Sequence, residues 1–430
     1  MAAPVGAGGT GGLIVDIRLG NGVRLVLEPM RHVRTASVGV WIPVGSRDDP
    51  PDAAGLAHFL EHLIFKGSRG RSARLLAEEM DALGGQFNAF TSRESTCFFA
   101  HVLSRHLTQA LELLAEMVSV PRLDDADTER ERQVVLDELA MVADDPAETA
   151  DDLFARALWG EDALGRPQAG TPASVGALAT SGLRQFHREH YVAGRMVVAA
   201  AGNLDPDRFR AAAERALGGL GPGAGAGVRT RAVAGPRPLR LAREGEQAHV
   251  VFGRLGPGQT DADRFAAAVW ASILGGSPSS RLFQVLREGH GLCYDVGTSR
   301  AEYSDGGEVG VYLATAPRDA ARAAEMAVAE VERLADEGPE AAELTRHCRQ
   351  LETGIWMDIE GTESRMQRLG RWALGGGDWL TPAELTERLR AVGRNDIREF
   401  AAGLGGVPGW AAAYLGPPSR APQGWNWREA

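Results

Sequence analysis

The sequence predicts an α+β protein built from two structurally similar domains. Three observations lead to this fold class. Strand-like runs precede helical patterns, this order recurs after the middle of the chain, and a segment without hydrophobic periodicity separates the two halves. The chain has 430 residues, of which 44% are hydrophobic, so it can supply a core to each of two domains.

The segment that divides the halves is rich in glycine and proline. It reads GGLGPGAGAGVRTRAVAGPRP over residues 218–238 and has no apolar period. This composition is typical of an interdomain linker. We therefore predict a first domain over residues 1–220, a linker over residues 221–236 and a second domain over residues 237–430.

In the first half, strand-like runs come before the helices. The runs LIVDIRL and VRLVLEP flank GNG, which predicts a β-hairpin, and the run TASVGVWIPVG follows. Apolar residues then recur at helical spacing in five stretches, at residues 53–65, 73–83, 105–118, 127–142 and 206–216.

The second half repeats this order coarsely. The strand-like run AHVVFGRLG is followed by predicted helices at residues 261–274 and 281–288. Two strands, around residues 294–300 and 308–314, then precede long helices between residues 317 and 374. The suspected repeat is structural, because the sequences of the two halves match only faintly.

Composition argues against several classes of protein. The net charge of −11 argues against nonspecific nucleic-acid binding, which needs clustered positive charge. We expect a cytoplasmic protein, because there is neither a run of about 18 apolar residues nor a signal-peptide pattern. Three scattered cysteines fit a reduced compartment better than a disulfide framework. Lys66, the only lysine, lacks the glycine frame of a P-loop.

The stretch GLAHFLEHLIFKGS, at residues 55–68, places three chemically active side chains on one predicted helix. His58 and His62 are four residues apart and share a face of the helix, and Glu61 borders this face. Zinc hydrolases use two imidazoles as ligands and a carboxylate as general base for the metal-bound water. The order H-x-x-E-H is the inverse of the usual zincin motif. The alternative is a pair of hydrogen-bonded core histidines.

A catalytic zinc site needs a third protein ligand, and Glu138 is the candidate. Its neighbours at helical spacing are all apolar: Val134, Val135, Met141 and Val142. A carboxylate on an apolar face is expensive to bury unless it is paired or bound to a metal. Glu131 lies two turns earlier on nearly the same face, where it can orient a metal ligand. The alternative for Glu138 is an ion pair with an arginine.

These residues together resemble a known family. The segment GSRDDPPDAAGLAHFLEHLIFKGS, followed by ERQVVLDE, is similar to the pitrilysin/insulinase family of zinc metallopeptidases, especially its mitochondrial-processing-peptidase-like branch. In that family a Glu-x6-Glu pair follows HxxEH about as far along the chain as Glu131 and Glu138 follow His62 here. The similarity continues through GGQFNAFTSRESTCF, HYVAGRMVVAAAGNL and SSRLFQVLREGHGLCYDVGTS, and so covers nearly the whole chain.

The resemblance implies a fold and a set of roles for the motif residues. The fold has two similar α+β domains, each with an antiparallel sheet packed with helices. His58, His62 and Glu138 would hold one zinc ion per chain. Glu61 would be the general base, and Glu131 would orient a metal ligand without binding the metal itself.

The resemblance also implies a place for the substrate. Asn88 and Ala89 would lie on an edge strand that binds the peptide as one more strand. Arg287 and Tyr294 would hold the substrate or stabilise the developing oxyanion. Without the resemblance, Arg287 would be interpreted as part of a surface salt bridge and Tyr294 as a buried strand aromatic.

Two further histidines are interpreted differently. His187 and His190, three residues apart in HREH, lack a partner carboxylate in an apolar setting. We therefore predict that they lie at a solvated helix end.

We expect from these residues a zinc-dependent metalloendopeptidase that cuts extended peptides or unfolded segments. The resemblance implies that two such chains enclose a chamber. This chain carries both the zinc motif and the Arg/Tyr segment, so we expect a homodimer, with a heterodimer with a related chain as the alternative. The alternative functions are a dedicated leader-peptide maturation protease and a non-catalytic partner subunit.

Overall fold

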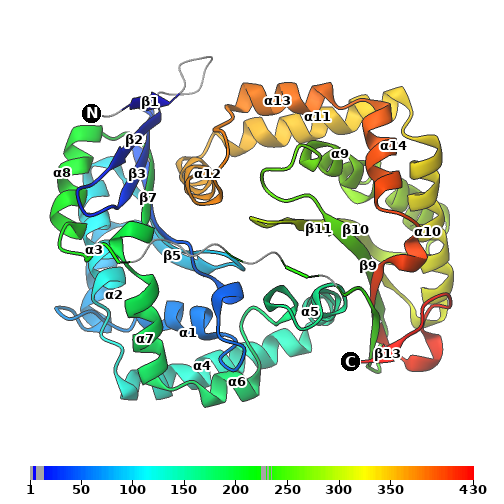
Figure 1. Cartoon of the computed structure of the whole chain (residues 1–430), viewed down its shortest axis with the longest axis horizontal. Coiled ribbons are helices and arrows are strands. Elements are labelled where there is room, and N and C mark those ends of the chain that lie inside the picture. The colour runs from blue at the N-terminus through cyan, green and yellow to red at the C-terminus, as the bar shows by residue number, and fades with distance from the viewer. Residues whose placement is uncertain (1–2, 6–13, 224–228, 230–231, 234) are drawn as a thin grey trace. The chain divides into compact units, whose positions relative to one another are not determined.

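The computed structural model describes residues 3–5, 14–223, 229, 232–233 and 235–430 (Figure 1). Contacts divide the chain into two compact units. The first unit contains Met1–Leu139, Pro167–Val228 and Trp356–Pro382. The second unit contains Ala140–Arg166, Arg229–Ile355 and Ala383–Ala430. The chain passes from the first unit to the second after Val228, inside the predicted linker. Residues 224–228, 230–231 and 234 of that linker lie outside the described residues.

The first unit is built on a seven-stranded sheet with the order β1-β2-β3-β7-β4-β6-β5. Its strands are Ala3–Val5 (β1), Ile14–Arg18 (β2), Arg24–Pro29 (β3), Thr35–Ile42 (β4), Gln86–Thr91 (β5), Thr96–Leu103 (β6) and Val197–Gly202 (β7). Strands β2 and β3 form the predicted hairpin, with Val15 opposite Leu27. The sheet is mixed, because β3 and β7 are parallel, whereas the resemblance implied an antiparallel sheet. A parallel neighbour needs a long crossover, which the intervening helices provide.

Helices cover one face of this sheet. They are Leu56–Ile64 (α1), Ala73–Leu83 (α2), Leu107–Ser119 (α3), Asp125–Asp144 (α4), Pro172–Ala177 (α6), Thr180–His190 (α7) and Pro206–Leu217 (α8). Five of them correspond to the helices predicted in the first half, whereas α6 was not predicted and only the end of α7, at His187 and His190, was expected to be helical. Alternation along β4 directs Val38 and Val40 into the core beneath these helices.

The other face of the first sheet carries a helix from late in the sequence, Thr362–Gly375 (α12), as Figure 1 shows. Trp41, which lies between Val40 and Ile42 on β4, points to this face and packs in one cluster with Met366 and Leu369 of α12. Trp41 is fully buried. One strand therefore contributes to two cores through its period of two.

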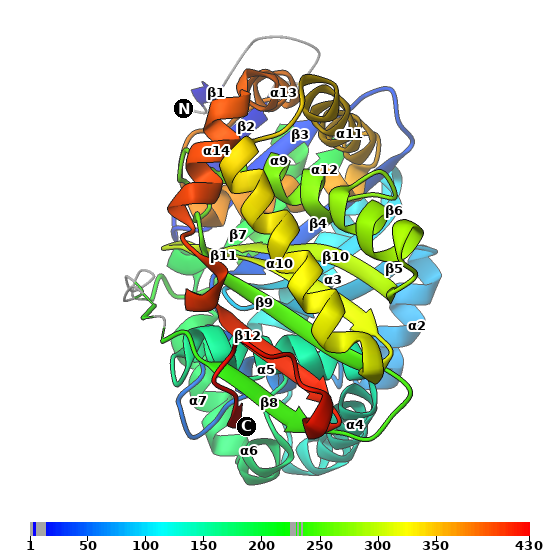
Figure 2. The same cartoon turned by 90° about the vertical axis from the view of Figure 1, so that its right-hand side faces the viewer.

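The second unit contains a six-stranded sheet with the order β10-β11-β9-β12-β8-β13. Its strands are Pro238–Ala242 (β8), Ala248–Gly256 (β9), Cys293–Glu302 (β10), Gly307–Thr315 (β11), Ala411–Gly416 (β12) and Arg428–Glu429 (β13). This sheet is also mixed, because β8 is parallel to β12 and to β13. The helices of this unit are Arg264–Gly275 (α9), Ala320–Glu337 (α10), Ala341–Asp358 (α11), Pro382–Ala391 (α13) and Arg394–Gly403 (α14), and Figure 2 shows α9, α10 and α14 in front of the sheet.

A helix from the first half of the sequence, Pro146–Trp159 (α5), covers the other face of the second sheet. Its residues Leu153, Phe154 and Leu158 form one cluster with Val251 and Ala413. Helices α5 and α12 are thus each packed on the sheet of the other half of the sequence. The sheets follow the linear division of the chain, whereas these two helices do not. Within the part of the chain that is described, no helix is long and apolar enough to span a membrane.

Candidate metal centre

Helix α1 begins at a sharp, tightly packed turn. Gly55 caps it with φ of 90°, and a Cβ at this position would lie 2.4 Å from the Ala169 carbonyl oxygen, so only glycine fits. The buried carboxylate of Asp49 accepts hydrogen bonds from the backbone N–H of Gly55 (2.8 Å) and of Ala57 (2.9 Å). These two bonds satisfy free amide groups at the helix start and fix the helix direction.

The predicted ligands converge in the first unit. The Nε2 atom of His58 lies 3.7 Å from Oε1 of Glu138, and the Nε2 atom of His62 lies 3.4 Å from Oε2. One ligand atom from each of the three side chains falls within 4.8 Å of the others. Two imidazole nitrogens and one carboxylate oxygen at such distances fit a zinc ion, which takes these donors at about 2 Å.

Helix α4 supplies the third candidate ligand because its apolar side packs against α1. Val135 and Leu139 of α4 share one core with Leu60 of α1. The guanidinium group of Arg132 donates to the Val175 and Leu178 carbonyl oxygens and lies 5.7 Å from the ring centroid of Phe59. These contacts fix the rotation of α4 and hence the position of Glu138.

The surroundings of Glu138 differ from the prediction. Val134 and Met141 are 49% and 74% exposed, and the Glu138 side chain itself is 44% exposed. The assumption of a buried apolar face around Glu138 was therefore wrong. Glu138 is distinguished instead by its two histidine neighbours, and among the described residues it has no arginine partner.

Glu131 lies on the Nδ1 side of the His62 ring. Its Oε1 is 3.0 Å from Nδ1 of His62 and its Oε2 is 2.7 Å from Nζ of Lys66. Burial acts to raise the pKa of Glu131, but the hydrogen bonds from His62 and Lys66 outweigh burial and lower the pKa. Glu131 is therefore a buried carboxylate that stays ionised and holds the imidazole of His62 from the side opposite Glu138.

The two histidines have opposite pKa shifts. Burial, with the charge of His62, lowers the pKa of His58. Burial also disfavours the charged form of His62, but the hydrogen bond to Glu131 and the charge of Glu138 raise its pKa overall. Metal ligation requires the neutral imidazole.

Glu61 does not belong to the ligand set but lies beside it. The Thr91 hydroxyl donates a hydrogen bond of 2.5 Å to Oε2 of Glu61. The Thr96 hydroxyl, 3.4 Å from that of Thr91, donates to the Val44 carbonyl oxygen. Burial raises the pKa of Glu61 although the Thr91 bond opposes this shift. A pKa raised toward the working pH suits a general base, because the carboxylate then takes up a proton more readily.

The structure places Asn88 and Ala89 on β5, which is an edge strand of the first sheet. They pair with Phe99 and Phe98 of β6, so the other edge of β5 has no strand partner among the described residues. Asn88 is exposed, and its Oδ1 accepts a hydrogen bond from the N–H of Ala89. The same strand ends at Thr91, the partner of Glu61.

Arg287 and Tyr294 lie in the second unit. Arg287 is exposed on a π-helical segment, Phe283–Gly289, where its guanidinium carbon is 4.9 Å from the ring centroid of Phe283. No described carboxylate forms an ion pair with it. Tyr294 is 59% exposed on β10. Neither a surface salt bridge nor a buried aromatic residue therefore explains these two side chains.

Two partners of the site residues were not predicted. Lys66 lies in the turn just after α1, and its contact with Glu131 joins it to a helix 65 residues away. Local spacing gave no signal for Thr91 either, because its contact with Glu61 joins a strand to a helix 30 residues away.

The histidines of HREH lie at a helix end, but the prediction that they are solvated was wrong for His187. Its Nε2 donates to the Val118 carbonyl oxygen at 2.8 Å, and its ring stacks on Tyr191. The ring of His190 packs on Phe186.

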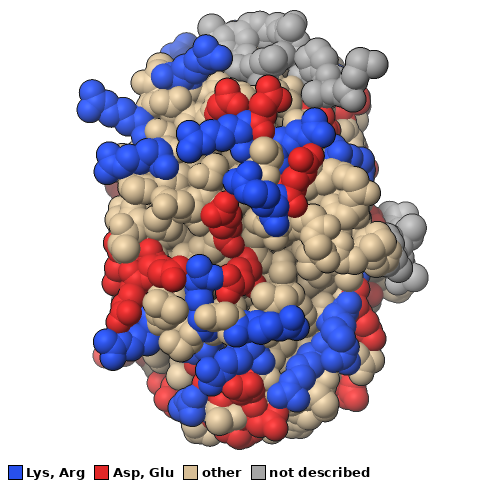
Figure 3. Space-filling view, turned by 90° about the vertical axis from the view of Figure 1, so that its left-hand side faces the viewer, with Lys and Arg blue, Asp and Glu red and all other residues tan. Residues whose placement is uncertain are grey.

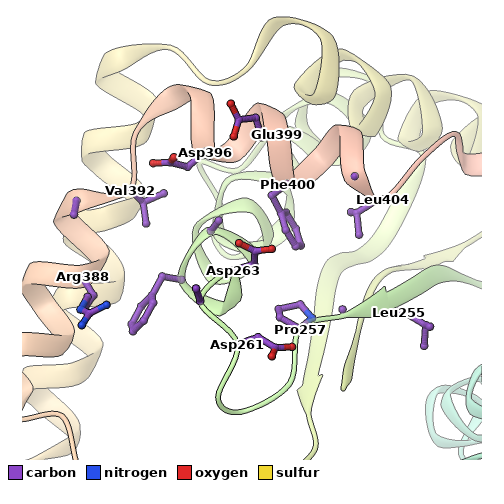
Figure 4. A pocket seen from close by; sticks show the side chains of 16 residues that line it. Leu255, Pro257, Asp261, Asp263, Arg388, Val392, Asp396, Glu399, Phe400 and Leu404 are labelled. Atoms are coloured by element: carbon purple, nitrogen blue, oxygen red, sulfur yellow. The ribbon is translucent and has the colours of Figure 1, made fainter. Parts of the chain in front are cut away.

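A hollow in the second unit contains none of the predicted site residues. It is lined by residues of β9, the β9–α9 connection, α9, α13 and α14, and Figure 4 shows the carboxylates of Asp261, Asp263 and Asp396 around Phe400. Two of these carboxylates have structural partners, since Asp261 accepts from the N–H of Gly258 and Asp396 from the N–H of Gly393. This hollow is therefore not the predicted site.

Comparison with known proteins matches both halves of the chain. Residues 24–172 match the family model of insulinase, peptidase family M16, and residues 181–351 match the model of the peptidase M16 inactive domain. An uncharacterized zinc protease of Streptomyces coelicolor is 38% identical over 91% of this chain and 87% of its own length. The chain belongs to peptidase family M16. Its relatives also include uncharacterized zinc proteases of Mycobacterium tuberculosis, 39% identical over 93% of this chain and 92% of theirs, and of Bacillus subtilis, 34% identical over 94% and 98%.

Solved structures share the fold of this M16 chain. The peptidase M16 inactive domain from Pseudomonas fluorescens superposes with a TM-score of 0.87 at 19% identity, over 95% of this chain and 99% of that one. A protease from Helicobacter pylori gives 0.88 at 19% identity, over 94% and 99%. The predicted duplicated α+β architecture is therefore confirmed, with mixed sheets.

Proposed function

We propose that this M16 chain is a zinc-dependent metalloendopeptidase that holds one zinc ion per chain. The observation that carries the proposal is the convergence of His58, His62 and Glu138 to within 4.8 Å, with Glu61 beside them but outside the ligand set. A structural zinc site would use all four positions for protein ligands, whereas three ligands leave room for water or substrate. The names of the relatives, which are zinc proteases, support this proposal.

Zinc and the side chains would have different roles in the reaction. When bound, zinc supplies a Lewis acid that polarises the peptide carbonyl and makes water a better nucleophile at neutral pH. Glu61 accepts a proton from the attacking water and returns it to the leaving amine, while Thr91 holds the carboxylate in place. Glu131 keeps the imidazole of His62 oriented through its Nδ1 atom.

An extended peptide fits the environment of this site. Strand β5 can pair with an incoming strand along its free edge, near Asn88 and Ala89, and it ends at the residue that holds Glu61. Main-chain pairing accepts any sequence in extended form, so unfolded segments are the expected substrate class. Arg287 and Tyr294, both exposed, would contribute charged and phenolic donors to the oxyanion. We propose that they act in a homodimer, where a chamber encloses the peptide.

The alternatives are distinguished by substrate and by activity. A dedicated leader-peptide protease would use the same chemistry on one sequence. A non-catalytic partner subunit is disfavoured, because the intact set of His58, Glu61, His62 and Glu138 would have no role in it. The second half matches a model described as inactive and carries no HxxEH motif, so one zinc per chain is expected, not two.

The test is cleavage of an internally quenched peptide library by the purified protein, with zinc measured by elemental analysis after gel filtration. We expect about one zinc per chain, cleavage that a chelator abolishes, and recovery when zinc is restored. His62→Ala should lose most of the metal and the activity. Full zinc occupancy in His62→Ala would overturn the ligand assignment, and zinc-loaded protein that cleaves no peptide would overturn the enzymatic proposal.

A further inference from the structure

A second pocket of the first unit has a different chemistry from the metal centre. It has a volume of about 390 Å³ and lies between α7, the connection from α3 to α4, and the loop that follows α1. Four of the residues that line it are arginines: Arg69, Arg122, Arg184 and Arg188. We call it the arginine pocket. None of the metal or substrate residues named above lines it.

Two of the four arginines are neutralised by neighbouring groups. Arg122 forms ion pairs with Asp124 at 2.5 Å and with Asp127 at 3.3 Å. Arg184 donates to the Leu123 carbonyl oxygen and pairs with Asp125 at 3.2 Å. These two guanidinium groups serve to fix the connection before α4 and are not free for a ligand.

Arg69 and Arg188 differ from this pair. Both side chains are exposed, and neither guanidinium group has a carboxylate partner anywhere in the described part of the chain. The backbone of Arg69 is fixed, because its N–H donates to the Val120 carbonyl oxygen at 2.9 Å. Two cationic groups on separate elements, an α-helix and a loop, thus line one small hollow without an internal counter-charge. Figure 3 shows several basic side chains, with acidic ones among them, over the lower part of this side of the molecule, where Figure 1 places α7.

Apart from the arginines, the side chains that line the arginine pocket are uncharged. Burial lowers the pKa of His187, and its Nε2 is occupied by the Val118 carbonyl oxygen. The ring of His187 stacks on that of Tyr191 at 4.8 Å, and Tyr191 is almost fully buried. Ser119, which also lines the pocket, has a shielded hydroxyl group with no hydrogen-bond partner among the described residues.

The backbone of the pocket is strained at one residue. Leu123 has φ of 44°, the only positive φ among the described residues other than glycine. This conformation is unfavourable for a residue with a Cβ. The two hydrogen bonds that the Leu123 carbonyl oxygen accepts from Arg184 hold the strained turn in place. Leu123 therefore has a fixed place in the lining of the pocket, beside Arg69 and Arg188.

We propose that the arginine pocket binds a small oxyanion, a phosphate or carboxylate group, through Arg69 and Arg188. Guanidinium groups match both oxyanions with paired N–H donors and keep their charge at every physiological pH. Ligand pockets measure roughly 300–1,000 Å³, so the volume of about 390 Å³ suits a small ligand. The net charge of the chain is −11, so a local excess of cations is a specific feature and not a general attraction for anions.

The experiment is calorimetric titration of the zinc-loaded protein with inorganic phosphate and, separately, with succinate, at constant ionic strength set with chloride. We expect saturable binding of one anion per chain. Arg69→Gln and Arg188→Gln should each weaken it about tenfold or more, because each removes charged hydrogen bonds. Arg208→Gln is the matched control, since Arg208 is also exposed in the first unit but lies outside the pocket.

The outcomes separate the possible sites and ligands. Tighter binding of phosphate than of succinate identifies a phosphate group as the ligand, and the reverse identifies a carboxylate. Absence of saturable binding for both anions would overturn the proposal. Equal affinity in the wild type and in both pocket variants would also overturn it, because the anion would then be bound at the metal or elsewhere. The melting temperatures of the variants without anion should match that of the wild type, which would exclude a folding defect as the cause of weaker binding.

Discussion

Nδ1 of His62 lies 3.0 Å from Oε1 of Glu131, and this contact joins the helix that carries the histidines to the helix that carries Glu138. Helix α4 therefore contributes twice to the candidate centre, with Glu138 on one side of the His62 ring and Glu131 on the other. A metal-facing imidazole is oriented by the group to which its second nitrogen donates, so the contact between His62 and Glu131 is expected to affect zinc affinity as well as geometry.

Glu131→Gln is expected to weaken zinc binding by about 10- to 100-fold while leaving the fold intact. The amide is nearly isosteric but no longer carries the charge that favours a donating Nδ1. Competition with a zinc chelator of known affinity measures the change. Asp137→Asn on the exposed side of the same helix is the control. Unchanged affinity in Glu131→Gln would mean that Glu131 does not orient His62.

Lys66 extends this contact, since its ammonium group lies 2.7 Å from the second oxygen of Glu131. Lys66→Met should weaken zinc binding, because the carboxylate loses a cation that helps to keep it ionised, whereas Lys66→Arg should retain most of the affinity. The chain has no other lysine, so amine reagents modify only Lys66 and the terminal amine.

Acetylation of Lys66 removes the charge and should weaken zinc binding as Lys66→Met does, whereas reductive methylation keeps the charge and should not. Peptide mapping establishes the site of modification. Equal zinc affinity of the acetylated and methylated proteins would contradict a role for the ammonium charge.

Local features of this site could be read from the sequence, and long-range ones could not. His58 and His62 converge because one helix holds both, and helical spacing is a local property. The third ligand lies on another helix, and local apolar neighbours gave the wrong reason for choosing Glu138, since Val134 and Met141 are exposed. The spacing implied by the family resemblance, and not the local environment, pointed to Glu138, which lies near His58 and His62.

For a similar reason, the sequence could not predict which helices pack on which sheet. The order of strands and helices in each half could be predicted from periodicity. Nothing in that periodicity states which sheet a helix covers, and α5 and α12 are each packed on the sheet of the other half of the chain. The parallel pairing of β3 with β7 is likewise a choice of partner between distant segments.

Glu61→Gln should keep zinc and the fold but lower turnover by about two to four orders of magnitude, because it removes only the base. The metal is retained because Glu61 is outside the ligand set. Steady-state cleavage of the quenched peptide and elemental analysis on the same sample measure both quantities. Near-normal hydrolysis by this variant would mean that another group takes the proton.

The second unit contains a carboxyl group whose ionisation should affect stability. Although the Asp151 side chain on α5 is partly open to solvent, the protein packed around it and the charges of Glu148 and Asp152 raise its pKa to about 6. Between the ordinary pKa of an aspartate and this value the folded state binds more protons than the unfolded state, so stability falls as the pH rises through this window. Asp151→Asn removes the charge and should raise the melting temperature at pH 8, with little change at pH 4.

Differential scanning calorimetry of Asp151→Asn at the two pH values is the measurement. Asp137→Asn, which replaces an exposed aspartate, should leave the difference between the two pH values as in the wild type. Equal stabilisation of Asp151→Asn at pH 4 and pH 8 would contradict an electrostatic origin.

The proposed homodimer can be tested by mixing inactive variants. The zinc motif and Arg287 are in different halves of the sequence, and the proposal assigns Arg287 to the site of the partner chain. Glu61→Gln and Arg287→Ala should each be nearly inactive as homodimers. After subunit exchange, random pairing makes half of the dimers hybrids, and each hybrid has one site with both an intact Glu61 and an intact Arg287. About a quarter of the wild-type activity should therefore return if the sites act independently. With exchange demonstrated by mass spectrometry, absence of recovery would mean that each site is completed within one chain or that Arg287 has another role.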